Sequence, residues 1–140
     1  MQAAAPGSHA DALRRIRSLL GPAGCIDAPE RTARFLTDFR ELYRGATPFV
    51  ACPATTAEVS QVLALCNAAR IAVVPQGGNT RYCGGATPSA RGDQLVLSLL
   101  SVTPTTEIYA GEFTLAAHAA LLLPNVQAAV EKGDMNAERA

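Results

Sequence analysis

The spacing of hydrophobic and polar positions along this chain predicts its first secondary-structure elements. Apolar residues recur at helical spacing over residues 8–20, with most of the arginines off the apolar face. Ser8 is suited to cap the start of this helix, and Gly21 is suited to end it. Residues 23–29 are predicted to form a loop, and residues 31–44 fit either a short helix or an irregular segment.

The middle of the chain predicts a strand–helix–strand unit. Residues 48–52 form a short apolar run that Pro53 closes. Residues 55–58 read Thr-Thr-Ala-Glu, a capping-box pattern, and precede a helical periodicity that ends near Ala69. The apolar run 71–74 follows almost at once and is predicted to be a second strand. Because such a crossover joins parallel strands, the unit predicts a short parallel sheet flanked by helices.

The last third of the chain predicts further strands and one helix. Residues 94–99 form a nearly continuous apolar strand, and 107–109 and 112–117 are expected to be two more. Residues 124–132 are predicted to be a helix with Gly133 as its C-cap. The fold class is therefore α/β or α+β: a small βαβ-containing subdomain followed by the start of a second, strand-rich one.

A glycine-rich loop is the main candidate for chemistry. Two glycine pairs, at 77–78 and 84–85, lie within residues 75–86, directly after the second strand. Glycine has no Cβ, so a ligand can approach the main chain, and successive N–H groups in such a turn attract anions, above all phosphate. A glycine-rich connection without a ligand is the alternative, and loop composition alone leaves both open. A Walker loop needs a lysine after the glycines and a Rossmann loop opens a helix; neither pattern is present.

Composition restricts the class of protein. The chain has 140 residues, 49% of them hydrophobic, as expected for one globular domain. Its 12 basic and 12 acidic residues balance, and this balance argues against a nucleic-acid partner. No apolar stretch approaches the roughly 20 residues that span a bilayer. The first 20 residues allow a transit-peptide interpretation, but an ordinary amphipathic helix is preferred and a cytoplasmic location is predicted.

The cysteines and histidines are too widely spaced for a structural metal site. The chain contains no Cys-x-x-Cys pair and has two histidines. A zinc site needs ligands clustered within a few residues of each other, so no metal is expected. We interpret the cysteines as small buried residues in a reducing compartment: Cys25, Cys52, Cys66 and Cys83.

A longer set of segments, taken in their order along the chain, indicates one particular cofactor and not only a general anion site. The segments are Tyr-Arg-Gly at 43–45, Val-Ala-Cys-Pro at 50–53, Pro-Gln-Gly-Gly-Asn-Thr at 75–80, Cys-Gly-Gly-Ala-Thr-Pro at 83–88 and Val-Leu-Ser-Leu at 96–99. Their order resembles the first FAD-binding subdomain of the vanillyl-alcohol oxidase and p-cresol methylhydroxylase flavoproteins. The branch most similar to it is that of the FAD-linked D-2-hydroxyacid dehydrogenases, which includes D-lactate dehydrogenase, the FAD subunit of glycolate oxidase and D-2-hydroxyglutarate dehydrogenase. The clear part of the resemblance covers residues 38–99.

The resemblance implies FAD as the cofactor and assigns residues to it. The main-chain N–H groups of residues 76–80 would wrap the FAD diphosphate, together with the side chains of Asn79 and Thr80. The second glycine pair would let the returning backbone approach the cofactor, and Pro53 would border the adenine. The residues assigned to cofactor binding are Pro53, Pro75, Gln76, Gly77, Gly78, Asn79, Thr80, Cys83, Gly84 and Gly85.

The chain departs from the family pattern near the implied cofactor. Arg81 either adds a charge-assisted hydrogen bond to a phosphate or crowds the flavin, and both interpretations stay open. Residues 101–104 replace an Arg-Met-Asn-type segment of the family. The run 118–120, His-Ala-Ala, replaces a Glu-Ala-Gly turn and so loses a glycine that can adopt positive φ. His118 is interpreted as a buried, hydrogen-bonded residue rather than a catalytic base.

Two functional hypotheses result. The first is the FAD-binding portion of an FAD-linked oxidoreductase acting on a D-2-hydroxy acid of the D-lactate, glycolate or 2-hydroxyglutarate class. It ends before the substrate domain, so a second polypeptide would supply the remaining FAD subdomain and the substrate domain. The alternative is a non-catalytic remnant or interaction module that has lost cofactor binding and exposes an apolar surface around 115–123. No catalytic residue is assigned, and the isolated chain is expected to be inactive. The expected divisions are an N-terminal helical segment at 1–45, a partial FAD-binding domain at 46–133 and a frayed tail at 134–140.

Overall fold

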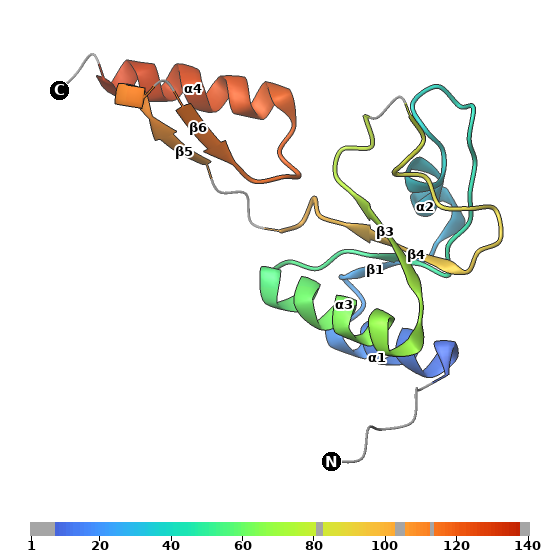
Figure 1. The fold of residues 1–140 in the computed structure, drawn as a ribbon. Helices are drawn as coiled ribbons and strands as arrows, with labels where there is room; N and C mark the ends of the chain where they lie inside the picture. Colours follow the sequence, from blue (N-terminus) through green and yellow to red (C-terminus); the bar gives the residue numbers. More distant parts are fainter. Residues whose placement is uncertain (1–7, 81–82, 103–105, 113, 138–140) are drawn as a thin grey trace.

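A four-stranded mixed sheet forms the centre of the molecule (Figure 1). The computed structural model describes residues 8–80, 83–102, 106–112 and 114–137. The strands are β1 (Cys25–Ile26), β2 (Val50–Ala51), β3 (Ala72–Gln76) and β4 (Gln94–Ser98), in the spatial order β1-β2-β4-β3. Strand β4 pairs in parallel with both β2 and β3, whereas β1 pairs antiparallel with β2. The parallel arrangement predicted for β2 and β3 is therefore confirmed, although β4 lies between them.

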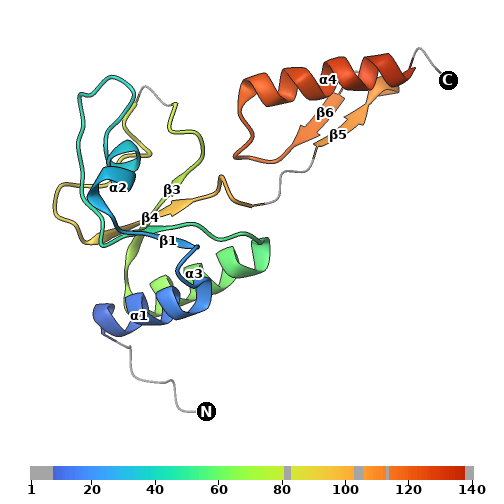
Figure 2. The same ribbon diagram turned by 180° about the vertical axis from the view of Figure 1, so that it is seen from behind.

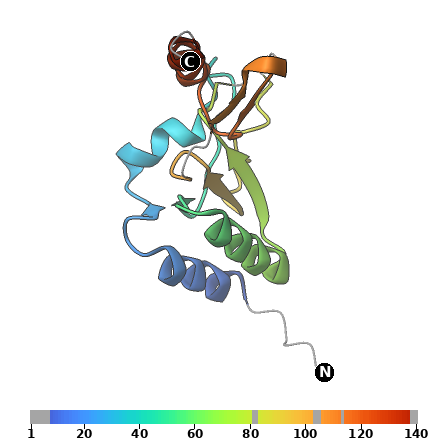
Figure 3. The ribbon, with the colours of Figure 1, turned by 90° about the vertical axis from the view of Figure 1, so that its left-hand side faces the viewer.

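Helices cover both faces of this sheet (Figure 3). Helices α1 (His9–Leu20) and α3 (Thr56–Ala69) share one face, and α2 (Pro29–Leu36) lies on the other. The alternation of side chains along β4 divides the core accordingly: Leu95 and Leu97 pack with α1 and α3, and Val96 packs with Phe35 of α2. All three β4 side chains are almost completely buried, so the sheet has two separate apolar interfaces.

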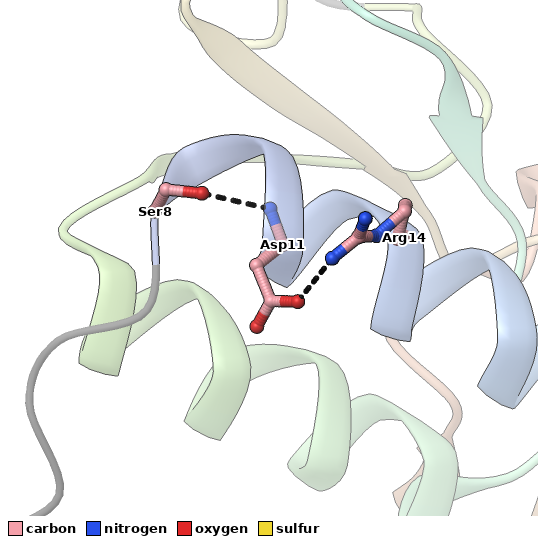
Figure 4. Close-up of polar contacts among 3 residues, drawn as sticks. All are labelled: Ser8, Asp11 and Arg14. Carbon is pink, nitrogen blue, oxygen red and sulfur yellow. Dashed lines mark hydrogen bonds and ion pairs between the residues drawn. The ribbon is translucent and has the colours of Figure 1, made fainter.

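Local hydrogen bonds begin helices α1 and α3 where the sequence predicts them. The Ser8 hydroxyl accepts from the main-chain N–H of Asp11, whose carboxylate pairs with Arg14 one turn later (Figure 4). Thr55 accepts from the N–H of Glu58 at 3.2 Å. The Glu58 carboxylate accepts from Ala54, one residue before the expected capping-box partner. Both caps use residues within four positions of each other, which is why the sequence alone locates them.

The C-terminal part is a hairpin with a helix beside it (Figures 1 and 2). Strands β5 (Thr106–Tyr109) and β6 (Thr114–Ala117) pair antiparallel, and a short 3-10 helix at Ala110–Glu112 joins them. Helix α4 (Leu123–Ala137) contacts β5. None of the described side chains of β5, β6 and α4 is buried. This part therefore contributes no closed core of its own.

Two expectations about individual elements are corrected, and one that left two alternatives open is decided. The predicted loop at 23–29 contains strand β1, because two residues are too short to show a period and become a strand only by pairing with β2. Gly133 does not end the last helix, since α4 continues to Ala137. The ambiguous segment 31–44 contains most of α2, followed by an irregular turn.

Within the described ranges, no helix is both long enough and apolar enough to cross a membrane.

Candidate functional site

The glycine loop leaves the carboxyl end of β3 and forms one wall of a groove. Residues 77–80 line this wall, and residues 119–124, which span the end of the β6–α4 connection and the first two residues of α4, line much of the opposite one. The groove has a volume of about 500 Å³. It lies at the edge of the sheet where the parallel strands end, which is the edge at which open α/β sheets bind ligands.

The main-chain N–H groups of the loop are available as hydrogen-bond donors. Among the described residues, the N–H groups of Gly77, Gly78, Asn79 and Thr80 form no hydrogen bond. Asn79 adopts a left-handed conformation with φ 53°. A left-handed residue within a run of successive N–H groups is typical of an anion-binding nest. These neutral donors fit a phosphate or diphosphate group.

The side chains of Gln76 and Asn79 have another role in the free chain. Both amide NH2 groups donate to main-chain carbonyls of neighbouring segments. The Asn79 side chain, which the resemblance directs to the diphosphate, therefore has both of its N–H donors already engaged. The remaining Asn79 oxygen is an acceptor and does not donate to a phosphate.

Leu122 covers the loop at its central glycine. A Cβ built on Gly78 would lie 2.1 Å from Cδ2 of Leu122, so this side chain occupies the space that the absent Cβ leaves. At Gly77 the nearest atom to such a Cβ would be Cα of Ala120, at 3.5 Å, which is ordinary contact. The sequence pattern marks the apolar run around Leu122 but not its contact with Gly78, since about 44 residues separate the two.

The other residues assigned from sequence lie outside this groove. Pro53 is fully buried, and Pro75, Cys83 and Gly85 are exposed. Gly84 has φ 69°, and a Cβ built on it would lie 2.9 Å from the ring of Tyr43. Both Gly84 and Tyr43 line a neighbouring hollow of about 520 Å³. The structure therefore brings together the residues of 77–80, and it places Gly84 of the second glycine pair beside Tyr43 instead.

The turn that faces the loop closes without a glycine. The main-chain N–H of Leu121 donates to the carbonyl of His118 at 2.9 Å, and Nδ1 of His118 accepts from the N–H of Ala120 at 3.3 Å. Ala120 is not among the described non-glycine residues with positive φ. His118 is half-buried and hydrogen-bonded, and it shapes this turn.

The thiols differ in environment more than the sequence suggests. Cys66 is buried, Cys25 and Cys52 are half-buried, and Cys83 is exposed, so the expectation of four buried cysteines is wrong for Cys83. Burial raises the pKa of the Cys66 thiol, and it also raises the pKa of Cys52, against a smaller lowering by its hydrogen bond to Ser98. Across the described residues, no three His, Cys, Asp or Glu side chains are grouped to hold a metal ion.

Comparison with known proteins identifies the family. A family model described as "FAD binding domain" matches residues 47–137. The chain belongs to this FAD-binding family. Family membership confirms the resemblance and confirms FAD as the expected cofactor.

The similar proteins are much longer than this chain. It is 37% identical over 91 residues to a mitochondrial protein of Oryza sativa subsp. indica named as a probable D-2-hydroxyglutarate dehydrogenase, and this match covers 65% of the chain and 16% of the relative. It is 43% identical over 72 residues to a D-2-hydroxyglutarate–pyruvate transhydrogenase of Saccharomyces cerevisiae, covering 51% and 14%. The match to each of these relatives thus spans about one sixth of the relative's length or less.

A solved structure confirms the expected fold class. An alkyldihydroxyacetonephosphate synthase matches with a TM-score of 0.71 at 17% identity, over 95% of this chain and 26% of that one. At this identity the likeness concerns the fold.

The residues of the groove fit part of FAD. The four N–H groups of 77–80, which have no partner among the described residues, suit the diphosphate, and the absent Cβ of Gly78 leaves room for close approach once Leu122 moves. The site therefore fits the diphosphate of the cofactor.

Proposed function

We propose that this chain is the FAD-binding portion of an FAD-linked oxidoreductase that acts on a D-2-hydroxy acid of the D-lactate, glycolate or 2-hydroxyglutarate class. Residues 77–80 hold the diphosphate through their main-chain N–H groups, and the flavin supplies hydride acceptance when bound. The catalytic and substrate-binding residues come from further protein, supplied by a second polypeptide or by a longer product. The observation that carries the proposal is the run of N–H groups at 77–80, which have no hydrogen-bond partner in the described part of the chain.

The names of the relatives support the substrate class. The relatives from Oryza sativa and Saccharomyces cerevisiae both carry D-2-hydroxyglutarate in their names. The division into segments 1–45, 46–133 and 134–140 and the cytoplasmic location remain proposals, and the Oryza sativa relative is named as mitochondrial. Of the ten assigned residues, four line the groove and Gly84 lines the neighbouring hollow, and the cofactor roles of all ten remain proposals.

Calorimetric titration with ADP, FAD and adenosine tests the proposal. ADP and FAD are expected to bind and adenosine is not, because the diphosphate makes the contacts. Gly77→Ala should lower ADP affinity about tenfold, since its Cβ enters the groove while keeping an ordinary contact distance to Ala120. Gly111→Ala is the matched control, because a Cβ there meets no atom within 4 Å and the residue lies outside the groove. A folded chain that retains neither ADP nor FAD at millimolar ligand would contradict the proposal.

The interaction-module alternative is supported by the exposed apolar side chains near the C-terminus. Leu123 is 68% exposed, and Ile108, Tyr109, Leu122 and Val130 are also exposed. A surface of this kind favours self-association or a protein partner. Light scattering distinguishes the two functions: a monomer that binds ADP supports the cofactor role, and an oligomer without ADP binding supports the module.

A further inference from the structure

The end of helix α2 is joined to the glycine loop by side-chain donors. The last carbonyls of a helix have no hydrogen-bond partner within the helix. Main-chain N–H groups at a C-terminal glycine turn, or water molecules, often donate to them. Here the carbonyls of residues 34–37, at and just after the end of α2, are all bonded to groups from other segments. Three of these bonds come from Gln76 and Asn79 and tie the helix end to the loop that forms the groove, whereas the fourth, to the Leu36 carbonyl, comes from Gly45.

Asn79 provides two of these bonds. Its Nδ2 donates to the carbonyl of Arg34 at 3.0 Å and to that of Thr37 at 2.9 Å. The amide has two N–H donors, and both are used. Asn79 also adopts φ 53°, a conformation that asparagine tolerates better than most residues. One residue thus bends the loop and anchors it to α2.

Gln76 provides a third bond from the end of β3. Its Nε2 donates to the carbonyls of Phe35, at 3.0 Å, and Ala86, at 2.9 Å, and the residue is 1% exposed. The two carbonyl acceptors define the orientation of the amide, and they leave its buried Oε1 without a partner among the described residues. Gly45 completes the set, donating its N–H to the carbonyl of Leu36 at 2.8 Å.

We infer that Asn79 and Gln76 are positioning residues that clamp the end of α2 to the glycine loop and thereby aim the main-chain N–H groups of 77–80 into the groove. The ligand is then bound by the main chain of the loop. Because no residue of α2 lines the groove, ligand binding affects α2 only through the hydrogen bonds of the clamp. The inference rests on the proposed function for its ligand, and the clamp itself is independent of that function.

Hydrogen exchange of the full chain, measured by mass spectrometry with and without ADP, tests the clamp. Asn79→Asp keeps the side-chain shape but replaces two donors by acceptors facing carbonyls. Asn79→Gly keeps positive φ accessible and removes the anchor. Each variant should speed exchange in peptides covering α2 and residues 76–80 roughly tenfold or more in the free protein, as expected for the loss of two hydrogen bonds. Asn67→Asp makes the same chemical change at an exposed position of α3 and should leave these peptides unchanged.

The effect of ADP on hydrogen exchange distinguishes a positioning role of Asn79 from a general loss of stability. ADP should slow exchange in α2 of the wild-type chain, and this slowing should be absent in Asn79→Gly even at ADP concentrations that saturate it. Loss of ADP affinity with unchanged α2 exchange in the free variants would overturn the inference and indicate direct contact between Asn79 and phosphate, with the proposed function intact. If the wild-type chain binds no ADP, the proposed function fails, and exchange in the free variants still decides whether the clamp exists. If Asn79→Asp does not fold, Asn79→Gly decides alone, and wild-type α2 exchange in it overturns the inference.

Discussion

The sheet with its three helices and the C-terminal hairpin with α4 are stabilised very differently. In the first region, Val50, Leu95 and Val96 are completely buried, and helices close both faces of the sheet. In the second, the described side chains of the strands and helix are all at least partly exposed. Burial of apolar area is the main favourable term in folding, so the first region carries most of the stability of the chain.

The candidate groove lies between these two regions, and this position explains its character. One wall belongs to a loop that β3 and α2 hold from behind. Much of the other wall is formed by residues 119–124, at the end of the β6–α4 connection and the start of α4, which belong to the weakly packed region. A rigid wall suits the recognition of a phosphate, and a loosely packed one suits admission of the ligand past Leu122.

The largest predicted effect is on the stability of the sheet region. Phe49→Ala removes a ring that is 1% exposed in the core and should cost about 3–5 kcal/mol of unfolding free energy. Ile108→Ala, in the hairpin, should cost under about 1 kcal/mol because the side chain is already partly in water. Urea unfolding followed by circular dichroism measures both. Equal losses would mean that the two regions form one cooperative core.

A smaller effect is expected at the groove. Leu122→Ala shortens the side chain that covers Gly78 and should raise ADP affinity about three- to tenfold, since the ligand no longer has to displace it. Leu63→Ala, an equal truncation at an exposed position of α3, is the control and should leave affinity unchanged. Calorimetric titration reports the change. Weaker ADP binding by Leu122→Ala would show that this leucine helps to hold the ligand instead of covering the loop.

The smallest predicted effect is a difference in thiol reactivity between Cys66 in the core and Cys83 in the loop. Only the thiolate reacts, and burial raises the pKa of Cys66, so a smaller fraction of this thiol is ionised at any given pH below its pKa. Cys83 is exposed and should react with a disulfide reagent near pH 8, while Cys66 should react only at higher pH or after unfolding. Peptide mass mapping of the labelled chain identifies the site, with urea as the control that exposes all four thiols. Rapid labelling of Cys66 at pH 8 would indicate that the core opens easily.

Sequence alone located the parts that depend on near neighbours. Helices α1 and α3 begin at Ser8 and Thr55 because a hydroxyl bonds an N–H three residues later, and the periodicity then continues the helix. The glycine loop and its family were also recognisable, since a continuous run of residues determines how the backbone bends and whether a ligand can approach it. The predicted anion-binding loop at 75–86 follows from that run.

Tertiary structure decided the features that join distant segments. Strand β1 exists because β2 offers it a partner, and β4 lies between β2 and β3 because its two faces bury side chains against different helices. The family resemblance implies that the Asn79 side chain binds phosphate, yet its amide donates to carbonyls of residues more than 40 positions away. Such bonds have no sequence period, because they form only when packing of the apolar core brings two segments together.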